Sequence, residues 1–237
     1  MLHYFGFLNT IMKKFAVIVA GGNGLRMGSS LPKQFLLLQN KPLLWHAITT
    51  FFNAYADIDI ILVLPKSHLD IGKQIAATFA DAHQITIVEG GETRFNSVKN
   101  GLAFVAPNAI VFVHDGVRCL VNVALVQRCF QQAVSKGSAI PAVAATDSIR
   151  IVHDTDTTVT NRNNVRIIQT PQTFKSDLLL AAFNQDFKDS FTDEATVVEA
   201  YGEKIFLIDG DYNNIKITRP IDLIIAEKFL EERELLP

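Results

Sequence analysis

The 237-residue sequence has few cysteines and little excess of charge of either sign. Its two cysteines, Cys119 and Cys129, form no CxxC pair, and no cysteines, histidines and acids have the spacing of a zinc site. We therefore expect two reduced thiols and a cytoplasmic setting. The formal net charge of −2 gives no general attraction to nucleic acid or to an anionic membrane, so neither is expected as a partner. Any anion site must come from a local cluster of basic residues.

Signals for secretion and membrane insertion are also missing. No window of eighteen or more residues is free of charge, so no transmembrane helix is expected. Lys13 and Lys14 follow the first apolar run instead of preceding it, and no small-residue cleavage site follows, which argues against a signal peptide. We expect residues 1–11 to be an extension outside the fold, with Met12 as a natural start.

Short apolar runs alternate with helical patterns along most of the chain. Residues 42–55 and 92–105 each place apolar side chains on one helical stripe, and a last helix is expected over about Ile221 to Leu235. This alternation predicts an α/β fold with a mostly parallel sheet and helices on both faces. The expected strands are Phe15–Ala20, Ile58–Leu64, Ile85–Glu89, Ile110–His114, Ser138–Ala144 and Lys204–Ile208.

Residues 147–169 depart from this alternation because they are polar and rich in Thr, Asn and Asp. Their partly alternating pattern predicts a β-hairpin with a turn near His153–Thr158. We interpret the segment as an insertion in the α/β chain, not as a linker between domains.

Residues 20–35, AGGNGLRMGSSLPKQF, follow the first predicted strand and combine glycines with two cations, Arg26 and Lys33. A glycine-rich turn at this place lets backbone N–H groups approach a phosphate. The dinucleotide pattern GxGxxG fails because Met27 stands where its last glycine is needed, and the Gly-Lys pair of a P-loop is missing. The loop therefore predicts a polyphosphate site of another kind. The alternative is a tight turn with solvated charges.

A second segment, VFVHDGVR at residues 111–118, places Asp115 at the carboxyl end of a strand, where open α/β sheets bind their ligands. A carboxylate there can hold Mg²⁺ against a nucleotide phosphate, or it can cap the next turn. We expect His114 to be a packing residue.

Two further segments carry candidate side chains. GGETRFNSVKNGL, at residues 90–102, puts Arg94 and Ser97 on one face of a helix start, which either binds a ligand or caps the helix. YNNIKITRPIDL, at residues 212–223, puts Lys216 in a predicted short strand before the last helix. A single lysine there would ordinarily be a solvated surface residue.

The order of these segments resembles a known enzyme family. AGGNGLRMGSSLPKQF, GGETRFNSV, VHDGVR, QTPQTF, FTDEA and NIKITRP occur from about Lys14 to the C-terminus. Their order and approximate spacing are similar to those of the 2-C-methyl-D-erythritol 4-phosphate cytidylyltransferases of the non-mevalonate isoprenoid pathway. The opening motif is shared with many sugar-nucleotide transferases, and the later motifs narrow the resemblance.

The resemblance implies a Rossmann-like nucleotidyltransferase domain over residues 1–237. It also implies a homodimer joined by the hairpin arm at 147–169, whose residues serve the partner's active site. The alternative for the arm is a mobile flap. The implied substrates are CTP and a polyol phosphate, with Mg²⁺ or another divalent cation as cofactor.

Individual site residues are also implied by the resemblance. The nucleotide would contact Ala20, Gly21, Gly22, Arg26, Lys33, Glu92, Arg94, Ser97, Asp115 and Gly116. The polyol phosphate would contact Asp115, Arg118, Ser148, Arg162, Thr170, Thr192 and Lys216. Asp115 would hold the metal, and the catalytic cations would be Arg26, Lys33, Arg162 and Lys216.

Three positions differ from the commonest family pattern. HDGVRC replaces HDAARP, and Ser148 replaces a threonine but keeps the hydroxyl. Asn213 stands where an aspartate commonly precedes NIK, and Asp211 is the acid that could substitute there. The first two changes keep Asp115, Arg118 and a hydroxyl group, and the third leaves no acid at position 213.

The implied reaction is an in-line attack of a phosphate oxygen on the α-phosphorus of CTP, with pyrophosphate as leaving group. Both reactants are anions, so cationic side chains and a metal must offset their repulsion, while the ionised attacker needs no general base. Two alternatives stay open. A ribitol-5-phosphate cytidylyltransferase would differ around the polyol and the arm, and a non-catalytic nucleotide-binding domain would require a decayed site.

Overall fold

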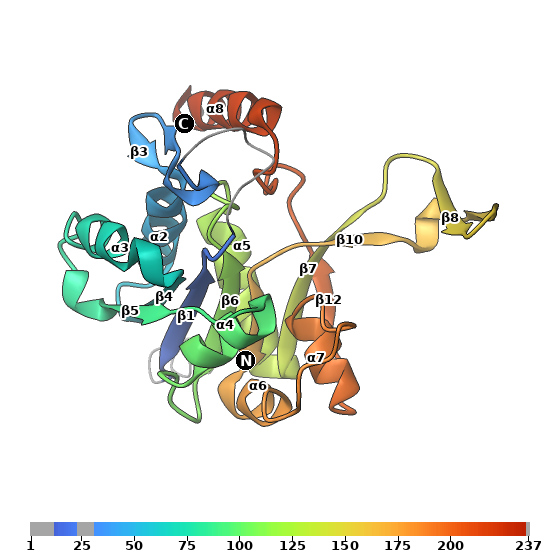
Figure 1. Cartoon of the computed structure of the whole chain (residues 1–237), viewed down its shortest axis with the longest axis horizontal. Coiled ribbons are helices and arrows are strands. Elements are labelled where there is room, and N and C mark those ends of the chain that lie inside the picture. The colour runs from blue at the N-terminus through green and yellow to red at the C-terminus, as the bar shows by residue number, and fades with distance from the viewer. Residues whose placement is uncertain (1–11, 23–30, 236–237) are drawn as a thin grey trace, which may run out of the picture.

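The computed structural model describes residues 12–22 and 31–235 (Figure 1). Its strands are β1 Lys14–Val19, β2 Leu37–Leu38, β3 Lys41–Pro42, β4 Ile58–Leu64, β5 Ile85–Glu89, β6 Ile110–Asp115, β7 Ser138–Ala144, β8 Ile149–His153, β9 Asp156–Thr160, β10 Arg166–Ile168, β11 Gln172–Lys175 and β12 Leu207–Asp209. Its α-helices are α2 Leu43–Ala54, α3 Leu69–Ala76, α4 Arg94–Leu102, α5 Val123–Lys136, α6 Ser176–Ala182, α7 Glu194–Ala200 and α8 Pro220–Leu235. Within the described ranges, none of these helices is long and apolar enough to cross a membrane.

The main sheet is mixed and has eight strands in the described part of the chain, in the order β10-β7-β11-β6-β1-β4-β5, with β12 paired to β7. The β6-β1-β4-β5 part is parallel, as the sequence predicts. Strand β11 runs antiparallel to both β6 and β7, and β10 runs antiparallel to β7. The α/β prediction is therefore confirmed. The short antiparallel strands β10 and β11 were not predicted, because no apolar run in the sequence marks them.

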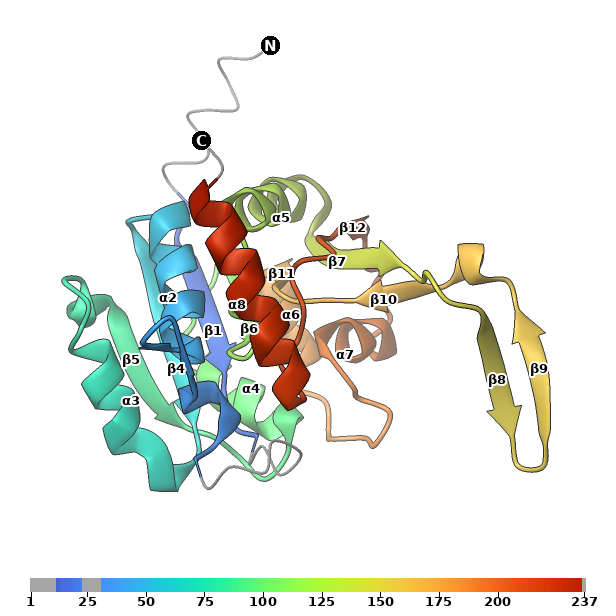
Figure 2. The ribbon, with the colours of Figure 1, turned by 90° about the horizontal axis from the view of Figure 1, so that it is seen from above.

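Helices cover both faces of the sheet (Figures 1 and 2). On one face, α2, α3 and α5 pack with alternate residues of β1, such as Ala16 and Ile18. On the other face, α4, α6 and α7 pack with Val17 and Val19 of the same strand. All six residues of β1 are buried, as expected for a strand that is covered on both sides.

The predicted bounds agree with the structure where an apolar run is long. Strands β4, β5 and β7 have the predicted limits, whereas β12 begins at Leu207 instead of Lys204 because only residues 207–209 pair with β7. Helix α4 begins at Arg94 and not at residue 92, because Thr93 is its N-cap and accepts a hydrogen bond from Asn96 N.

The predicted hairpin is present at β8 and β9 and extends away from the sheet (Figure 2). Asp154, in the turn, has a positive φ of 38°, which tight hairpin turns favour. The chain then returns through β10, which pairs with β7 in the main sheet. The arm is thus an excursion from the sheet and both of its ends are attached there.

Candidate active site

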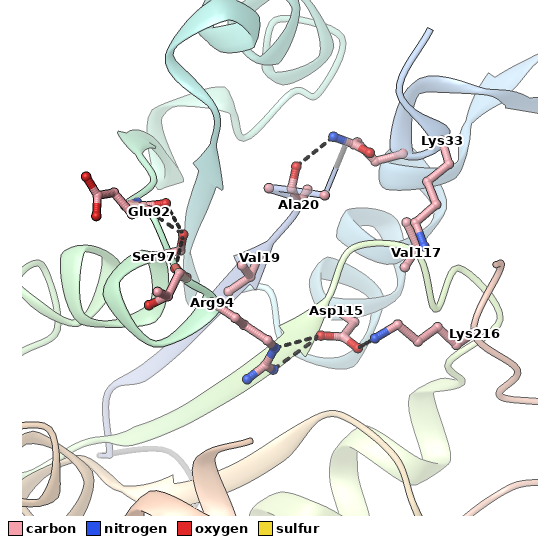
Figure 3. Close-up of a pocket in the computed structure, with 14 residues that line it drawn as sticks. Val19, Ala20, Lys33, Glu92, Arg94, Ser97, Asp115, Val117 and Lys216 are labelled. Atoms are coloured by element: carbon pink, nitrogen blue, oxygen red, sulfur yellow. Dashed lines mark hydrogen bonds and ion pairs between the residues drawn. The ribbon is translucent and has the colours of Figure 1, made fainter. Parts of the chain in front are cut away.

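A cleft of about 260 Å³ lies at the carboxyl ends of the parallel strands (Figure 3). The residues that directly follow β1 and β6 still bond to the neighbouring strand. Ala20 N donates to Val63 O (3.0 Å), and Gly116 N donates to Val19 O (2.9 Å). This is the edge at which open α/β sheets bind ligands. The predicted site residues that line the cleft are Ala20, Gly21, Gly22, Lys33, Glu92, Arg94, Ser97, Asp115 and Lys216.

The start of α4 is fixed against the cleft by the hydroxyl group of Ser97. This oxygen donates to Thr93 O (2.9 Å) and accepts from Gly91 N (3.1 Å). A Cβ atom at Gly91 would lie 2.4 Å from Cβ of Asn96, so the turn before the helix requires glycine. Because Ser97 already has these backbone partners, its contact with a base or ribose stays a prediction.

Asp115 lies between two cations in the cleft (Figure 3). Its Oδ1 accepts from Nη2 of Arg94 at 3.2 Å, and its Oδ2 is 2.8 Å from Nζ of Lys216. The side chain of Asp115 is 12% exposed, that of Arg94 30% and that of Lys216 44%. Both carboxylate oxygens are thus occupied, and Lys216 is the more exposed of the two cations.

Burial and charge act in opposite directions on these groups. Burial raises the pKa of Asp115, but Arg94 and Lys216 lower it further, so the net shift is downward and the carboxylate stays ionised. Burial lowers the pKa of Arg94, but the carboxylates of Glu194 and Asp115 raise it above its ordinary value. The site therefore holds fixed charges near neutral pH.

Lys216 lies in an irregular segment, so the predicted short strand is wrong. A backbone bond from Ile217 N to Val117 O (3.0 Å) is not continued into a ladder. Lys33 reaches the same segment, with Nζ 3.0 Å from Ile217 O. A single lysine at this place would ordinarily be a solvated surface residue, but Lys216 forms an ion pair with Asp115 in the cleft.

Three predicted residues lie behind the cleft instead of lining it. Gly116 is buried, and a Cβ atom there would lie 2.9 Å from Leu44 Cδ1. Thr170 is buried, and its Oγ1 accepts from Asp115 N at 3.0 Å. Arg118 donates to the backbone oxygens of Asn214 (2.8 Å) and Ile168 (3.4 Å). These residues support the site from within.

Four other predicted residues are not seen in the cleft. Ser148 and Arg162 are exposed in the segment that forms the arm, and Nη1 of Arg162 donates to Thr146 O at 2.8 Å. Thr192 is exposed in the loop before α7. Arg26 falls outside the described residues, so its place in the site stays a prediction.

Two residues of the site were not assigned from the sequence. Gln34 lines the cleft, and its Nε2 donates to Ala20 O at 2.7 Å. Glu194 is fully buried and forms two hydrogen bonds with Arg94. Both lie in quoted motifs, PKQF and FTDEA, but no local spacing links them to Ala20 or Arg94.

His114 is a packing residue, as predicted. It is fully buried against the ring of Phe51, and its ring nitrogens lie 3.0 Å from Thr170 Oγ1 and 3.2 Å from Arg118 O. Burial lowers its pKa to about 4, so it is neutral near neutral pH.

The described residues contain no group of three or more His, Cys, Asp or Glu side chains that could hold a metal. Mg²⁺ does not need such a cluster, because it commonly binds to one or two carboxylates together with substrate phosphates. Asp115 fits a site of that kind. Asp211, named above as the acid that could stand in for one at position 213, does not line the cleft, and its oxygens accept from Asn122 Nδ2 (2.6 Å) and Asn213 N (2.8 Å).

Comparison with known proteins shows what the chain is similar to. The family model of 2-C-methyl-D-erythritol 4-phosphate cytidylyltransferase matches residues 14–232. The chain belongs to this family. It is 43% identical over 219 residues to the Bacteroides fragilis enzyme of that name and 44% identical over 219 residues to that of Bacteroides thetaiotaomicron, covering 92% of this chain and 100% of each relative.

Solved structures of the family have the same fold. The crystal structure of 4-diphosphocytidyl-2C-methyl-D-erythritol synthase from Anaerococcus prevotii superposes with a TM-score of 0.79 at 30% identity, and the match covers 93% of this chain and 99% of that one. The family reaction converts CTP and 2-C-methyl-D-erythritol 4-phosphate into 4-diphosphocytidyl-2-C-methyl-D-erythritol and pyrophosphate. The chain is a cytidylyltransferase of the non-mevalonate isoprenoid pathway.

Proposed function

We propose that the cleft at the ends of β1 and β6 carries out this reaction with the residues that line it. Gly21, Gly22 and Lys33 bind the triphosphate of CTP, while Asp115 and Lys216 face the methylerythritol phosphate. The observation that carries the proposal is the ion pair of Lys216 with Asp115, only 2.8 Å long, at the strand ends in the cleft that Gly21 and Gly22 also line.

The bond changes require charge stabilisation and positioning more than proton transfer. A phosphate oxygen of methylerythritol phosphate forms a bond to the α-phosphorus, and the bond from that phosphorus to the β-phosphate oxygen breaks, so pyrophosphate leaves with the electron pair. Lys33 and Lys216 offset the charge that gathers between the two anions. The attacking oxygen is already ionised, so none of the buried side chains needs to act as a base.

A divalent cation fits the proposal at Asp115. The carboxylate of Asp115 would hold the cation, which would supply positive charge to offset that of the triphosphate. Oδ2 of Asp115 forms an ion pair with Lys216, and movement of Lys216 toward the substrate phosphate would leave that oxygen free to hold the cation.

The arm supports a proposal for a homodimer. Ser148 and Arg162 lie near or on an arm that extends away from its own sheet (Figure 2). Val152 and Val159 in this arm are 71% and 75% exposed. We infer that a second copy covers these apolar side chains and receives Arg162 near its own methylerythritol phosphate. Full activity of a monomer in sedimentation at assay concentration would contradict this arrangement.

Pyrophosphate release tests the substrates. Purified protein with CTP and Mg²⁺ is expected to release pyrophosphate when methylerythritol phosphate is added, and much more slowly with ribitol 5-phosphate. Preference for ribitol 5-phosphate would keep the fold and the CTP site but overturn the substrate. CTP binding without release for either compound would favour a binding domain.

Replacement of Lys33 tests the charge role directly. Loss of one charge contact at the transition state typically costs about 2.7–4 kcal/mol, so Lys33→Ala should lower kcat by roughly a hundredfold or more. Lys73→Ala is the matched control, because Lys73 is a lysine with a 66% exposed side chain on α3. Near-normal turnover of Lys33→Ala would remove Lys33 from the mechanism.

A further inference from the structure

Glu194 is a buried carboxylate that does not line the cleft. Its side chain is 1% exposed, at the first residue of α7. It does not cap its own helix, because Asp193 does so by accepting from Thr196 N at 2.9 Å. Both oxygens of Glu194 instead accept from Arg94, at 2.5 Å from Nη1 and 3.1 Å from Nη2.

This pairing gives Arg94 two carboxylate partners. A buried carboxylate is costly unless it is paired, and a guanidinium matches a carboxylate through two parallel hydrogen bonds. While Glu194 holds Nη1 and Nη2, the Nε and Nη2 atoms of Arg94 lie 3.4 Å and 3.2 Å from Oδ1 of Asp115. Glu194 therefore sets the plane and reach of the side chain that contacts Asp115.

The two cations on Asp115 are consequently unequal. Arg94 is fixed from behind by a fully buried acid, whereas Lys216 is 44% exposed on an irregular segment. On the basis of the proposed function above, we infer that Glu194 is a positioning residue. It keeps Arg94 on Oδ1 of Asp115, so that Oδ2 is the oxygen released when Lys216 turns to the substrate phosphate.

The charges support this division of roles. Glu194, Arg94, Asp115 and Lys216 carry two negative and two positive charges, so together they are neutral. Once Lys216 contacts a phosphate, the other three carry a net charge of −1, which favours a divalent cation at Asp115. If residue 194 were uncharged, Arg94 and Asp115 would balance each other, and the net charge would be zero. Arg94 would then be free to turn toward the triphosphate.

Glu194→Gln tests the inference in the full-length protein. The amide keeps the size of the side chain but turns an N–H donor toward Arg94, which breaks the paired hydrogen bonds. We expect kcat to fall about ten- to a hundredfold, the range that follows loss of a residue orienting a metal-site ligand. The affinity for CTP alone, measured by calorimetry, should be no weaker than in the wild type, because a negative charge near the cleft is gone.

A double-mutant cycle separates positioning from general damage. Arg94→Lys keeps the charge but cannot reach both carboxylates, so the double variant should lose no more kcat than Arg94→Lys alone. Ser176→Ala is the control for a lost buried acceptor, since its Oγ accepts from Ala109 N (2.9 Å) at the opposite end of the sheet. That variant should lose stability and keep its kcat.

The outcomes are distinct. Unchanged kcat in Glu194→Gln, additive losses in the cycle, or CTP affinity that falls in parallel with kcat would overturn the positioning role. If Glu194→Gln does not fold, Glu194→Asp replaces it in the test. The shorter side chain keeps the charge but pulls Arg94 away from Asp115, so a normal kcat in that variant would also overturn the inference. Failure of the wild type to release pyrophosphate with both substrates would instead refute the proposed function.

Discussion

Gly101 on α4 offers a test of how the packing of one helix supports the site. A Cβ atom there would lie 2.7 Å from Val17 Cγ1 and 2.9 Å from Val63 Cγ2. Both valines are fully buried on central strands, and β-branched side chains have few rotamers, so neither can move aside. The helix must therefore shift away from the sheet.

The expected effect of Gly101→Ala is a balance of two terms. Alanine has a higher helix propensity than glycine, by about 1 kcal/mol. Overpacking a core, however, costs about 1–3 kcal/mol. Because both contacts are with buried side chains, we expect the overpacking term to win, with a net loss of about 1–2 kcal/mol in the free energy of unfolding. The displacement of α4 should also weaken CTP binding, since the helix begins with Arg94.

Urea unfolding and calorimetry with CTP check both effects. Lys99→Ala is the control, because Lys99 is exposed on the same helix and its Nζ lies 5.7 Å from the centroid of the Phe95 ring, which belongs to the helix itself and not to a strand. The reasoning would be refuted if Gly101→Ala were as stable as the wild type or more stable, since the helix propensity would then outweigh the steric contact.

Two further predictions concern stability. Burial lowers the pKa of His114 from 6.5 to about 4, so the unfolded chain takes up its proton first, and the free energy of unfolding should fall by about 3 kcal/mol between pH 6.5 and 4. His114→Gln should flatten that part of the wild-type curve of urea stability against pH, and a superimposable curve would contradict the assignment. Gly137 caps α5 at a φ of 93°, so Gly137→Ala should cost about 1–2 kcal/mol in thermal or urea unfolding, and no loss would show that the turn tolerates Cβ.

Much of the fold could be predicted because its parallel strands are apolar along their whole length. Strands such as β4 and β7 are buried on both faces, so their composition alone marks them. The strand β11 could not be predicted in this way, since its four residues, QTFK, owe their conformation to neighbours on both sides. The same holds for the segment around Lys216, where side-chain bonds replace a ladder.

The candidate site was predictable to the extent that its chemistry lies in glycines, cations and strand ends. Asp115 was selected for its place at a strand end and Lys216 from the family resemblance, and the two meet in the cleft. The contact of Arg94 with Glu194 could not be predicted, because the two residues are 100 positions apart and belong to different helices. Local spacing also did not indicate that Thr170 and Arg118 use their polar atoms to support the backbone.

Arg118 joins two segments that are distant in sequence. It holds Ile168 O, at the end of the strand that returns from the arm, and Asn214 O, two residues before Lys216. Asn214 in turn donates to Thr170 O at 2.8 Å, just after the same strand. A force on the arm is therefore transmitted to the backbone beside Lys216. If a second copy binds the arm, formation of the dimer and the position of the Lys216 side chain become mechanically coupled.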